Sequence, residues 1–132
     1  MISGSAARDD PRRLRLLIVE SEESQRKGMA LALTKYSLEI VTTSDPLAAI
    51  RLVQEERFDV ILSDINFQIM DGLQVISRFR QLAPEVVLVI LTACAEQDIK
   101  KKLTQMGITQ FLEKPVNLDE LKRMIGELHE MA

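Results

Sequence analysis

The fold is decided by the stretch Phe58–Asp64 (FDVILSD), a nearly continuous apolar run that ends in an acid. Two further runs have the same form: Leu14–Val19 precedes Glu20, and Val86–Leu91 precedes Thr92. Strands that are covered on both faces are apolar throughout, whereas strands with one wet face alternate between apolar and polar residues. The three runs therefore predict neighbouring, buried strands of a parallel sheet.

Two weaker apolar runs, Leu38–Thr42 and Thr109–Leu112, bring the predicted strands to five. The segments between the runs change to helical spacing, Ser44-Asp45-Pro46 is typical of a helix start, and Gly107 is typical of a helix end. This alternation predicts an α/β fold, a doubly wound five-stranded parallel sheet with five helices, and the length favours the flavodoxin-like strand order 2-1-3-4-5. The helical spacing is carried by Met29, Leu33 and Tyr36, by Ile99, Leu103 and Met106, and by Leu121, Ile125 and Leu128.

The composition is that of one ordinary folded domain. The chain has 132 residues, 46% of them hydrophobic, and 17 basic against 20 acidic residues give a net charge of −3. This balance argues against direct nucleic-acid binding and against a membrane surface as partner. Because Cys94 and His129 are the only residues of their types, the chain has neither an internal disulfide nor a Cys/His metal cluster.

The first residues lack the apolar block of a secretory signal, and no apolar run approaches the ~20 residues that span a bilayer. We therefore expect a cytoplasmic protein. Residues 1–13 are interpreted as a flexible lead-in, native or left over from cloning, and residues 14–132 as the folded domain.

Four polar side chains follow the predicted strands: Glu20, Asp64, Thr92 and, one residue later, Lys114. Because parallel strands end at one edge of the sheet, these side chains are expected to converge there. Two carboxylates in one crevice repel unless a cation neutralises them, and a hard dication such as Mg²⁺ can do so. A carboxylate beside a lysine and a hydroxyl also suits the formation of an acyl phosphate. The alternative is that each residue is structural or merely solvated, as polar residues at strand ends commonly are.

Three segments resemble the receiver domain of bacterial two-component response regulators, over nearly the whole of residues 14–130. Asp59–Asn66, followed by Met70-Asp71-Gly72, is similar to the family's phospho-acceptor strand and loop. Leu91-Thr92-Ala93 is similar to its switch threonine with the small residue that follows. Phe111–Pro115 (FLEKP) is similar to its aromatic–lysine–proline stretch.

The resemblance implies that Asp64 accepts a phosphoryl group from a sensor histidine kinase or a phosphotransfer protein, in a Mg²⁺-dependent reaction. Lys114 would pair with Asp64 and then with a phosphoryl oxygen, and the backbone carbonyl of Asn66 would bind Mg²⁺. Thr92 would swing toward the phosphoryl group and Phe111 would turn inward. The domain would then be a phosphorylation-controlled switch, not an enzyme beyond its own phosphorylation and dephosphorylation.

The resemblance also implies a cis bond between Lys114 and Pro115 and a helix that opens at Gly72 after the acceptor loop. It places homodimer or output-domain contacts on the face formed by the fourth helix, the fifth strand and the fifth helix. The kinase, the output and the oligomeric state are not encoded in any motif of the chain.

Two departures from the family pattern concern the metal. Ser21 stands where the family has a second acid that binds the ion directly, so weakened Mg²⁺ affinity is expected. Glu20, one methylene longer than aspartate, is expected to reach inward, and Glu22 is a second candidate for rescue. Gln68 replaces a common proline, which leaves the loop more backbone freedom. The alternative to a phosphorylation-controlled switch is a degenerate receiver that acts as a phosphate-independent interaction module. A flavin-binding protein is disfavoured, because no Gly/Ser/Thr-rich phosphate loop follows the first or third strand.

Overall fold

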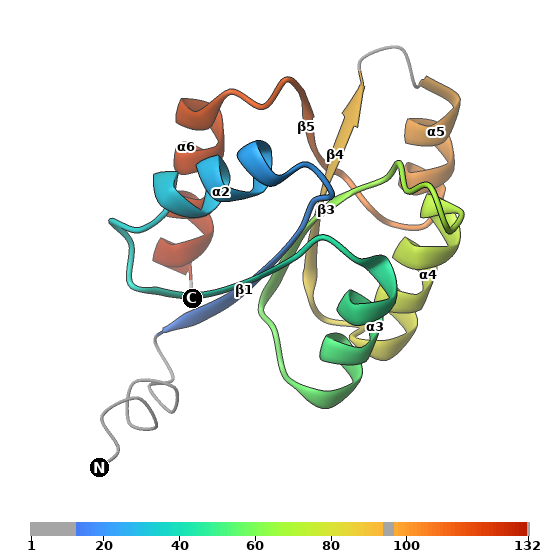
Figure 1. The fold of residues 1–132 in the computed structure, drawn as a ribbon, viewed down its shortest axis with the longest axis horizontal. Helices are drawn as coiled ribbons and strands as arrows, with labels where there is room; N and C mark the ends of the chain where they lie inside the picture. Colours follow the sequence, from blue (N-terminus) through green and yellow to red (C-terminus); the bar gives the residue numbers. More distant parts are fainter. Residues whose placement is uncertain (1–12, 94–96, 132) are drawn as a thin grey trace.

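Five strands and five helices alternate in the computed structural model, which describes residues 13–93 and 97–131 (Figure 1). The strands are all parallel and lie in the order β2-β1-β3-β4-β5, which confirms the predicted fold and strand order. Cys94 and residues 1–12 of the predicted lead-in lie outside the described residues. The elements are β1 Leu14–Val19, α2 Glu23–Ala32, β2 Leu38–Thr43, α3 Pro46–Glu55, β3 Val60–Asp64, α4 Gly72–Leu82, β4 Val87–Ala93, α5 Gln97–Gln105, β5 Gln110–Lys114 and α6 Leu118–Met131.

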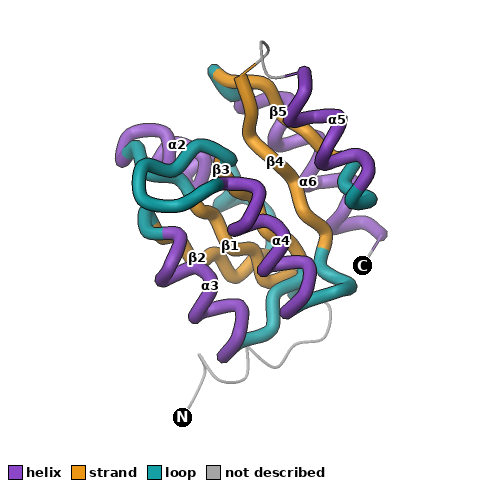
Figure 2. The backbone as a smooth tube through the Cα atoms, turned by 90° about the vertical axis from the view of Figure 1, so that its right-hand side faces the viewer, coloured by secondary structure: helices purple, strands orange, loops and turns teal. Residues whose placement is uncertain are grey.

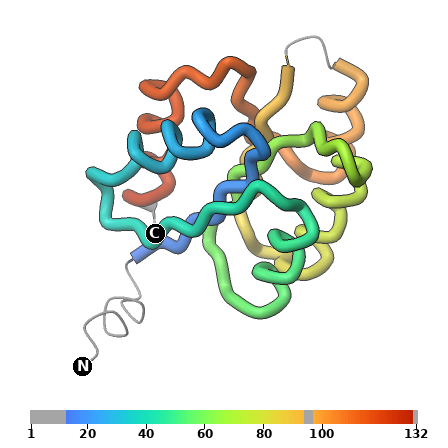
Figure 3. The backbone as a smooth tube through the Cα atoms, viewed as in Figure 1, coloured from blue at the N-terminus to red at the C-terminus, as the bar shows by residue number. Residues whose placement is uncertain are grey.

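The sheet has helices on both faces, because alternate residues of each buried strand point to opposite sides. In Figures 2 and 3, α3, α4 and α5 cover one face and α2 and α6 cover the other. On the first face, Leu17 of β1 and Ile61 of β3 pack with Phe79 of α4, and on the second, Ile18 and Leu62 pack with Met29 of α2. This double burial explains why β1, β3 and β4 are apolar at nearly every position.

The strands end later than the apolar runs predict. Asp64, Thr92 and Lys114 were expected to follow their strands, but each lies within one: Asp64 ends β3, Lys114 ends β5, and Thr92 is the residue before the last of β4. The reason is that the ladder is made by backbone groups, and Asp64 still pairs with Leu91 whatever its side chain. Only Glu20 follows its strand, as predicted.

Helix ends agree with the predicted signals, with one correction. Asp45 caps α3 by accepting from the Leu47 N–H at 3.0 Å, and Gly107, with φ of 85°, follows the end of α5. The spacing predicted that Tyr36 belongs to the helix of Met29, but α2 ends at Ala32. There the Thr34 hydroxyl donates to the Leu31 carbonyl at 2.9 Å, and the backbone tightens into turns that end the helix.

At the opposite end of the sheet from Asp64, Arg15 ties several segments together. Its guanidinium forms an ion pair with Glu39 of β2, lies 2.7 Å from Glu56 after α3, and stacks 4.8 Å above the ring of Phe58. Burial lowers the pKa of Arg15, but hydrogen bonds and charges of Glu56 and Glu39 outweigh it and raise this pKa. The contact holds the amino ends of β1 and β3 in place, far from the polar rim described next.

Candidate functional site

Buried polar side chains gather at the carboxyl ends of three central strands. Among the residues that the structure describes, those buried with polar or charged side chains are Glu20, Ser63, Asp64 and Thr92. They lie at or next to the carboxyl ends of β1, β3 and β4, beside the point where the strand order reverses, and this is where open α/β sheets bind ligands. Buried charge is costly unless it is compensated, so the contacts of these groups show how their charges are balanced and what the site can bind.

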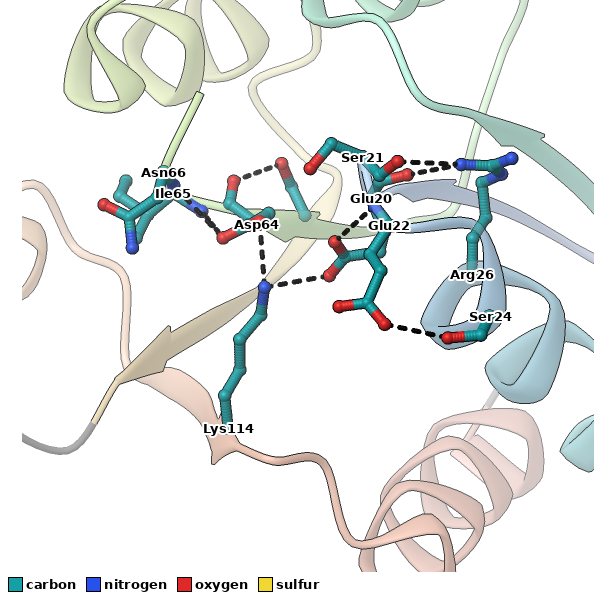
Figure 4. A network of polar contacts seen from close by, with 10 residues as sticks. Glu20, Ser21, Glu22, Ser24, Arg26, Asp64, Ile65, Asn66 and Lys114 are labelled. Atoms are coloured by element: carbon teal, nitrogen blue, oxygen red, sulfur yellow. Dashed lines mark hydrogen bonds and ion pairs between the residues drawn. The ribbon is translucent and has the colours of Figure 1, made fainter. Parts of the chain in front are cut away.

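Asp64 ends β3 with a carboxylate that is held on both oxygens. Its Oδ1 accepts from the backbone N–H of Ile65 at 2.7 Å and from that of Asn66 at 3.1 Å. Its Oδ2 accepts from Nζ of Lys114 at 2.8 Å (Figure 4). With a side chain that is 4% exposed, this carboxylate is fixed in direction rather than free to rotate.

Lys114 ends β5 and bridges two carboxylates from different strands. Its Nζ lies 2.8 Å from Asp64 Oδ2 and 2.9 Å from Glu20 Oε1. Burial lowers the pKa of the Lys114 ammonium, but the hydrogen bond to Asp64 and the negative charges of Asp64 and Glu20 outweigh burial and raise this pKa above its usual value. The lysine is therefore a fixed cation at neutral pH, and one positive charge faces two negative ones.

Glu20 reaches inward, as its longer side chain predicts, and is 1% exposed. Its Oε2 accepts from the backbone N–H of Glu22 at 3.0 Å, and its own N–H donates to the Thr43 carbonyl at 3.1 Å. Its Oε1 is buried and accepts no hydrogen bond among the described residues; its contact with Lys114 is an ion pair without hydrogen-bond alignment. One buried carboxylate oxygen thus retains an unused lone pair.

Ser21 and Glu22 do not join this group. Both are exposed, and the Glu22 carboxylate accepts from the Ser24 hydroxyl at 2.8 Å, away from Asp64 (Figure 4). Sequence reasoning missed Arg26, which donates to the backbone carbonyls of Glu20 at 2.9 Å and Ser21 at 3.4 Å. The only sequence signal was a basic residue in the second turn of the helix that follows an acidic loop.

Thr92 and Phe111 flank the site on β4 and β5. Thr92 is fully buried, and its hydroxyl donates to the Ala93 carbonyl at 3.2 Å. Phe111 is half-buried against the core, with Nζ of Lys100 5.8 Å from its ring centroid. The same Nζ lies 3.3 Å from Glu113, so Lys100 connects α5 to β5.

The loop after Asp64 is shaped by the start of α4. Asp71 caps this helix by accepting from the Leu73 N–H at 2.9 Å, and Gly72 is its first residue, as predicted. A Cβ on Gly72 would lie 1.6 Å from the backbone oxygen of Ile65, so no side chain fits there. The bond between Lys114 and Pro115 is cis, as predicted.

The donor set suits a hard divalent cation, although a three-ligand cluster is missing. No three His, Cys, Asp or Glu side chains within residues 13–93 and 97–131 are placed to hold a metal together. Mg²⁺ needs only one or two carboxylates beside waters and phosphate oxygens. Glu20 and Asp64 supply two buried carboxylates, and the unused lone pair of Glu20 Oε1 is a group that such an ion would satisfy.

A doubly wound α/β domain with buried acids and a lysine at one rim defines the receiver class of signalling domains. The chain belongs to the response regulator receiver domain family of two-component systems, whose family model matches residues 16–126. No helix in the described part of the chain is both long and apolar enough to cross a bilayer.

The relatives include regulators and kinases. The chain is 30% identical over 117 residues to the transcriptional regulatory protein GlrR of Escherichia coli K12, covering 89% of this chain and 26% of GlrR. It is 31% identical over 111 residues to the sensor histidine kinase RcsC of Salmonella typhi, covering 84% of this chain and 12% of RcsC. Its fold is similar to that of the chemotaxis response regulator CheY4 of Vibrio cholerae, with a TM-score of 0.79, 26% identity, and coverage of 88% and 98% of the two chains. The chain thus spans less than a third of either curated relative.

Proposed function

We propose that the domain is a phosphorylation-controlled switch that accepts a phosphoryl group on Asp64. The observation that carries this proposal is the fixed contact between Asp64 Oδ2 and Lys114 Nζ at 2.8 Å, with Glu20 at 2.9 Å on the other side of the same ammonium. A carboxylate held beside a cation is a directed nucleophile toward phosphorus.

In the proposed reaction, the Asp64 carboxylate attacks the phosphorus of a phosphohistidine. An O–P bond forms, the N–P bond breaks, and its electron pair leaves with the imidazole nitrogen, which takes up a proton. Lys114 moves its hydrogen bond from Asp64 to a phosphoryl oxygen and neutralises charge there. Water later attacks the acyl phosphate, which restores the carboxylate and releases inorganic phosphate.

Mg²⁺ held by Glu20, Asp64 and the backbone carbonyl of Asn66 would supply further neutralisation of the phosphoryl oxygens. Ser21 contributes a neutral, exposed hydroxyl where the family pattern has an acid. Since ligand charge sets affinity for hard cations, we infer a weaker ion site than in receivers with the full acidic pair.

The phosphoryl donor is a histidine on a kinase or phosphotransfer protein. A groove of about 220 Å³ beside Pro115 has Gly28 and Met29 on one side and Val116 and Leu118 on the other. A Cβ on Gly28 would meet nothing within 4 Å, so the groove is open at that point. This is where a donor helix would lie while its histidine reaches Asp64.

The output is a population shift that involves Thr92 and Phe111. Thr92 is buried beside the acceptor strand, and Phe111 lies in the adjoining strand beneath Lys100 of α5. Phosphorylation on Asp64 would recruit the Thr92 hydroxyl, and Phe111 would follow inward. The affected surface, α5–β5–α6, is where a homodimer or an output domain would dock.

Intact-mass measurement with acetyl phosphate and MgCl₂ tests the proposal. The expected result is a mass gain of one phosphoryl group that needs Mg²⁺ and is absent in Asp64→Asn. No gain at high Mg²⁺ would favour the second candidate function, a phosphate-independent interaction module. That candidate is favoured by Ser21, because its hydroxyl leaves the site short of a carboxylate.

A further inference from the structure

Large hydrophobic side chains are exposed on two sides of the sheet. Leu31 of α2 and Leu118 of α6 lie on the side of the proposed donor groove, 73% and 41% exposed. Leu47 of α3 and Ile69 before α4 lie on the other side, 50% and 66% exposed. The proposed function uses neither Leu47 nor Ile69, so it does not explain why they are exposed.

Leu47 belongs to a groove between α3 and α4, two helices that lie side by side in both Figure 1 and Figure 2. The groove has a volume of about 530 Å³. Its floor is Ile50 and Met70. Ile69 extends the apolar surface into an adjoining hollow with Pro46 and Phe67, and the polar lining of that hollow includes Ser21, Glu22 and Asp45. Contiguous exposed apolar surface of this kind marks interaction sites.

Arg78 is the one charged residue among the described side chains that line this groove. On α4, Gln74, Arg78 and Gln81 follow one helix face into the groove, and α4 contains no acidic residue. On α3, Arg51 is exposed one turn after Leu47. Among the described residues neither Arg51 nor Arg78 forms an ion pair, although the whole chain carries a net charge of −3. The groove therefore has an apolar floor with Arg78 in its lining and Arg51 on the neighbouring helix, while Asp45 and Asp71 cap the two helices at their amino ends.

This charge pattern decides between possible occupants. A second copy docked across a two-fold axis would place Arg51 and Arg78 against the same two residues of its partner, which repels. A segment with an apolar stripe and flanking carboxylates matches both the apolar floor and the two arginines. A groove between two helices suits a third helix that offers apolar residues at i, i+3 or i+4 and i+7.

We propose that the α3–α4 groove, formed by Leu47, Ile50, Met70, Gln74, Arg78 and Gln81, binds an acidic amphipathic helix of a partner protein. Leu47 and Met70 take the apolar stripe, and Arg51 and Arg78 pair with carboxylates on its edges. This surface is separate from both the donor groove and α5–β5–α6, so it gives the domain a site for a third partner.

A synthetic helical peptide of about 16 residues, with leucines on one face and glutamates beside them, tests the proposal. The matched control peptide has lysine at each glutamate position. Titration into the ¹⁵N-labelled full chain should give saturable amide shifts at Leu47, Met70, Gln74 and Arg78, and the lysine peptide should bind at least about tenfold more weakly.

Leu47→Asp and Arg78→Glu should each weaken binding of the glutamate peptide about tenfold. Leu31→Asp, on the opposite side of the sheet, is the control and should leave this binding unchanged. Circular dichroism melts confirm that each variant is folded. Equal affinity for the two peptides, shifts confined to α2 or α5–β5–α6, or a dimer that Ile69→Glu dissociates would each overturn the proposal. The titration uses neither phosphodonor nor Mg²⁺, so its outcome does not depend on the proposed switch function.

Discussion

Nζ of Lys114 lies 2.8 Å from Oδ2 of Asp64, so the ends of β5 and β3 are joined across the intervening strand β4. The same ammonium lies 2.9 Å from Glu20, which extends the connection to the end of β1. One cation thus organises three strand ends. A substitution of Lys114 should therefore change both the stability of this edge of the sheet and the affinity of the site for other cations.

Lys114→Met tests this coupling. Removing the ammonium leaves the two buried carboxylates of Glu20 and Asp64 facing each other, and we expect a loss of about 1–3 kcal/mol in the free energy of unfolding, less than for a fully buried pair because Lys114 is partly exposed. Millimolar Mg²⁺ should restore more stability to this variant than to the native chain, since the ion replaces the missing charge. Urea unfolding with and without MgCl₂ measures both effects. Lys102→Met, which removes an exposed charge, is the control; an equal Mg²⁺ effect in both variants would contradict the coupling.

Ser21→Asp should tighten Mg²⁺ binding about tenfold, because it adds a carboxylate where the family pattern has one. Isothermal titration calorimetry measures the affinity directly, without an optical probe. Ser24→Asp adds the same charge one turn away, where the hydroxyl contacts Glu22, and should change the affinity little. If both variants bind Mg²⁺ alike, the gain is a general charge effect and Ser21 is not at a ligand position.

The sequence predicts which charged residues meet at the site better than it predicts the contacts and the strand ends that position them. Parallel strands end at one edge of the sheet, so apolar runs followed by Glu20, by Asp64 and, one residue later, by Lys114 are enough to predict that these side chains meet, and the structure brings the three together. Arg26 was missed because it binds backbone carbonyls, which every residue has, so no pattern reports the contact. The strand ends were misplaced by one or two residues for a related reason: backbone pairing continues past the last apolar side chain.

The exposure of Leu47 also lay beyond sequence reasoning. Its place on α3 gives helical spacing, but whether a neighbouring helix covers it depends on how α3 and α4 pack on the sheet. Leu47 lies beside the buried stripe of α3, which is formed by Pro46, Ala49, Ile50 and Val53, and it is half exposed in the structure. Whether an apolar side chain on one helix is covered by another helix is therefore visible only in the structure.

Arg15→Met should lower stability without affecting the proposed phosphoryl-transfer site. The variant loses the contacts to Glu39 and Glu56 that hold β1, β2 and the chain before β3, and we expect a loss of about 1–2 kcal/mol in the free energy of unfolding. Arg57→Met is the matched control: Arg57 is 87% exposed and pairs with Asp59 only at 3.3 Å, so its loss should stay within about 0.5 kcal/mol. Mg²⁺ affinity should be unchanged in both variants, and a reduced affinity in Arg15→Met would show that the two ends of the sheet are coupled.

Gly72 and Gly28 offer a pair of identical substitutions with opposite expected signs. At Gly72 a methyl group would lie 1.6 Å from the Ile65 carbonyl oxygen, so Gly72→Ala must push the loop after Asp64 away from α4 and should cost at least about 3 kcal/mol in the free energy of unfolding. At Gly28, inside α2, a methyl group meets nothing within 4 Å, and Gly28→Ala should raise stability by up to about 1 kcal/mol through helix propensity. Thermal and urea unfolding of both variants measure the difference.

The same two variants should also differ in Mg²⁺ affinity. The loop that moves in Gly72→Ala carries the Asn66 N–H that holds Asp64, so Mg²⁺ affinity should fall in this variant and stay unchanged in Gly28→Ala. A stable Gly72→Ala with native Mg²⁺ affinity would show that the loop tolerates a side chain there.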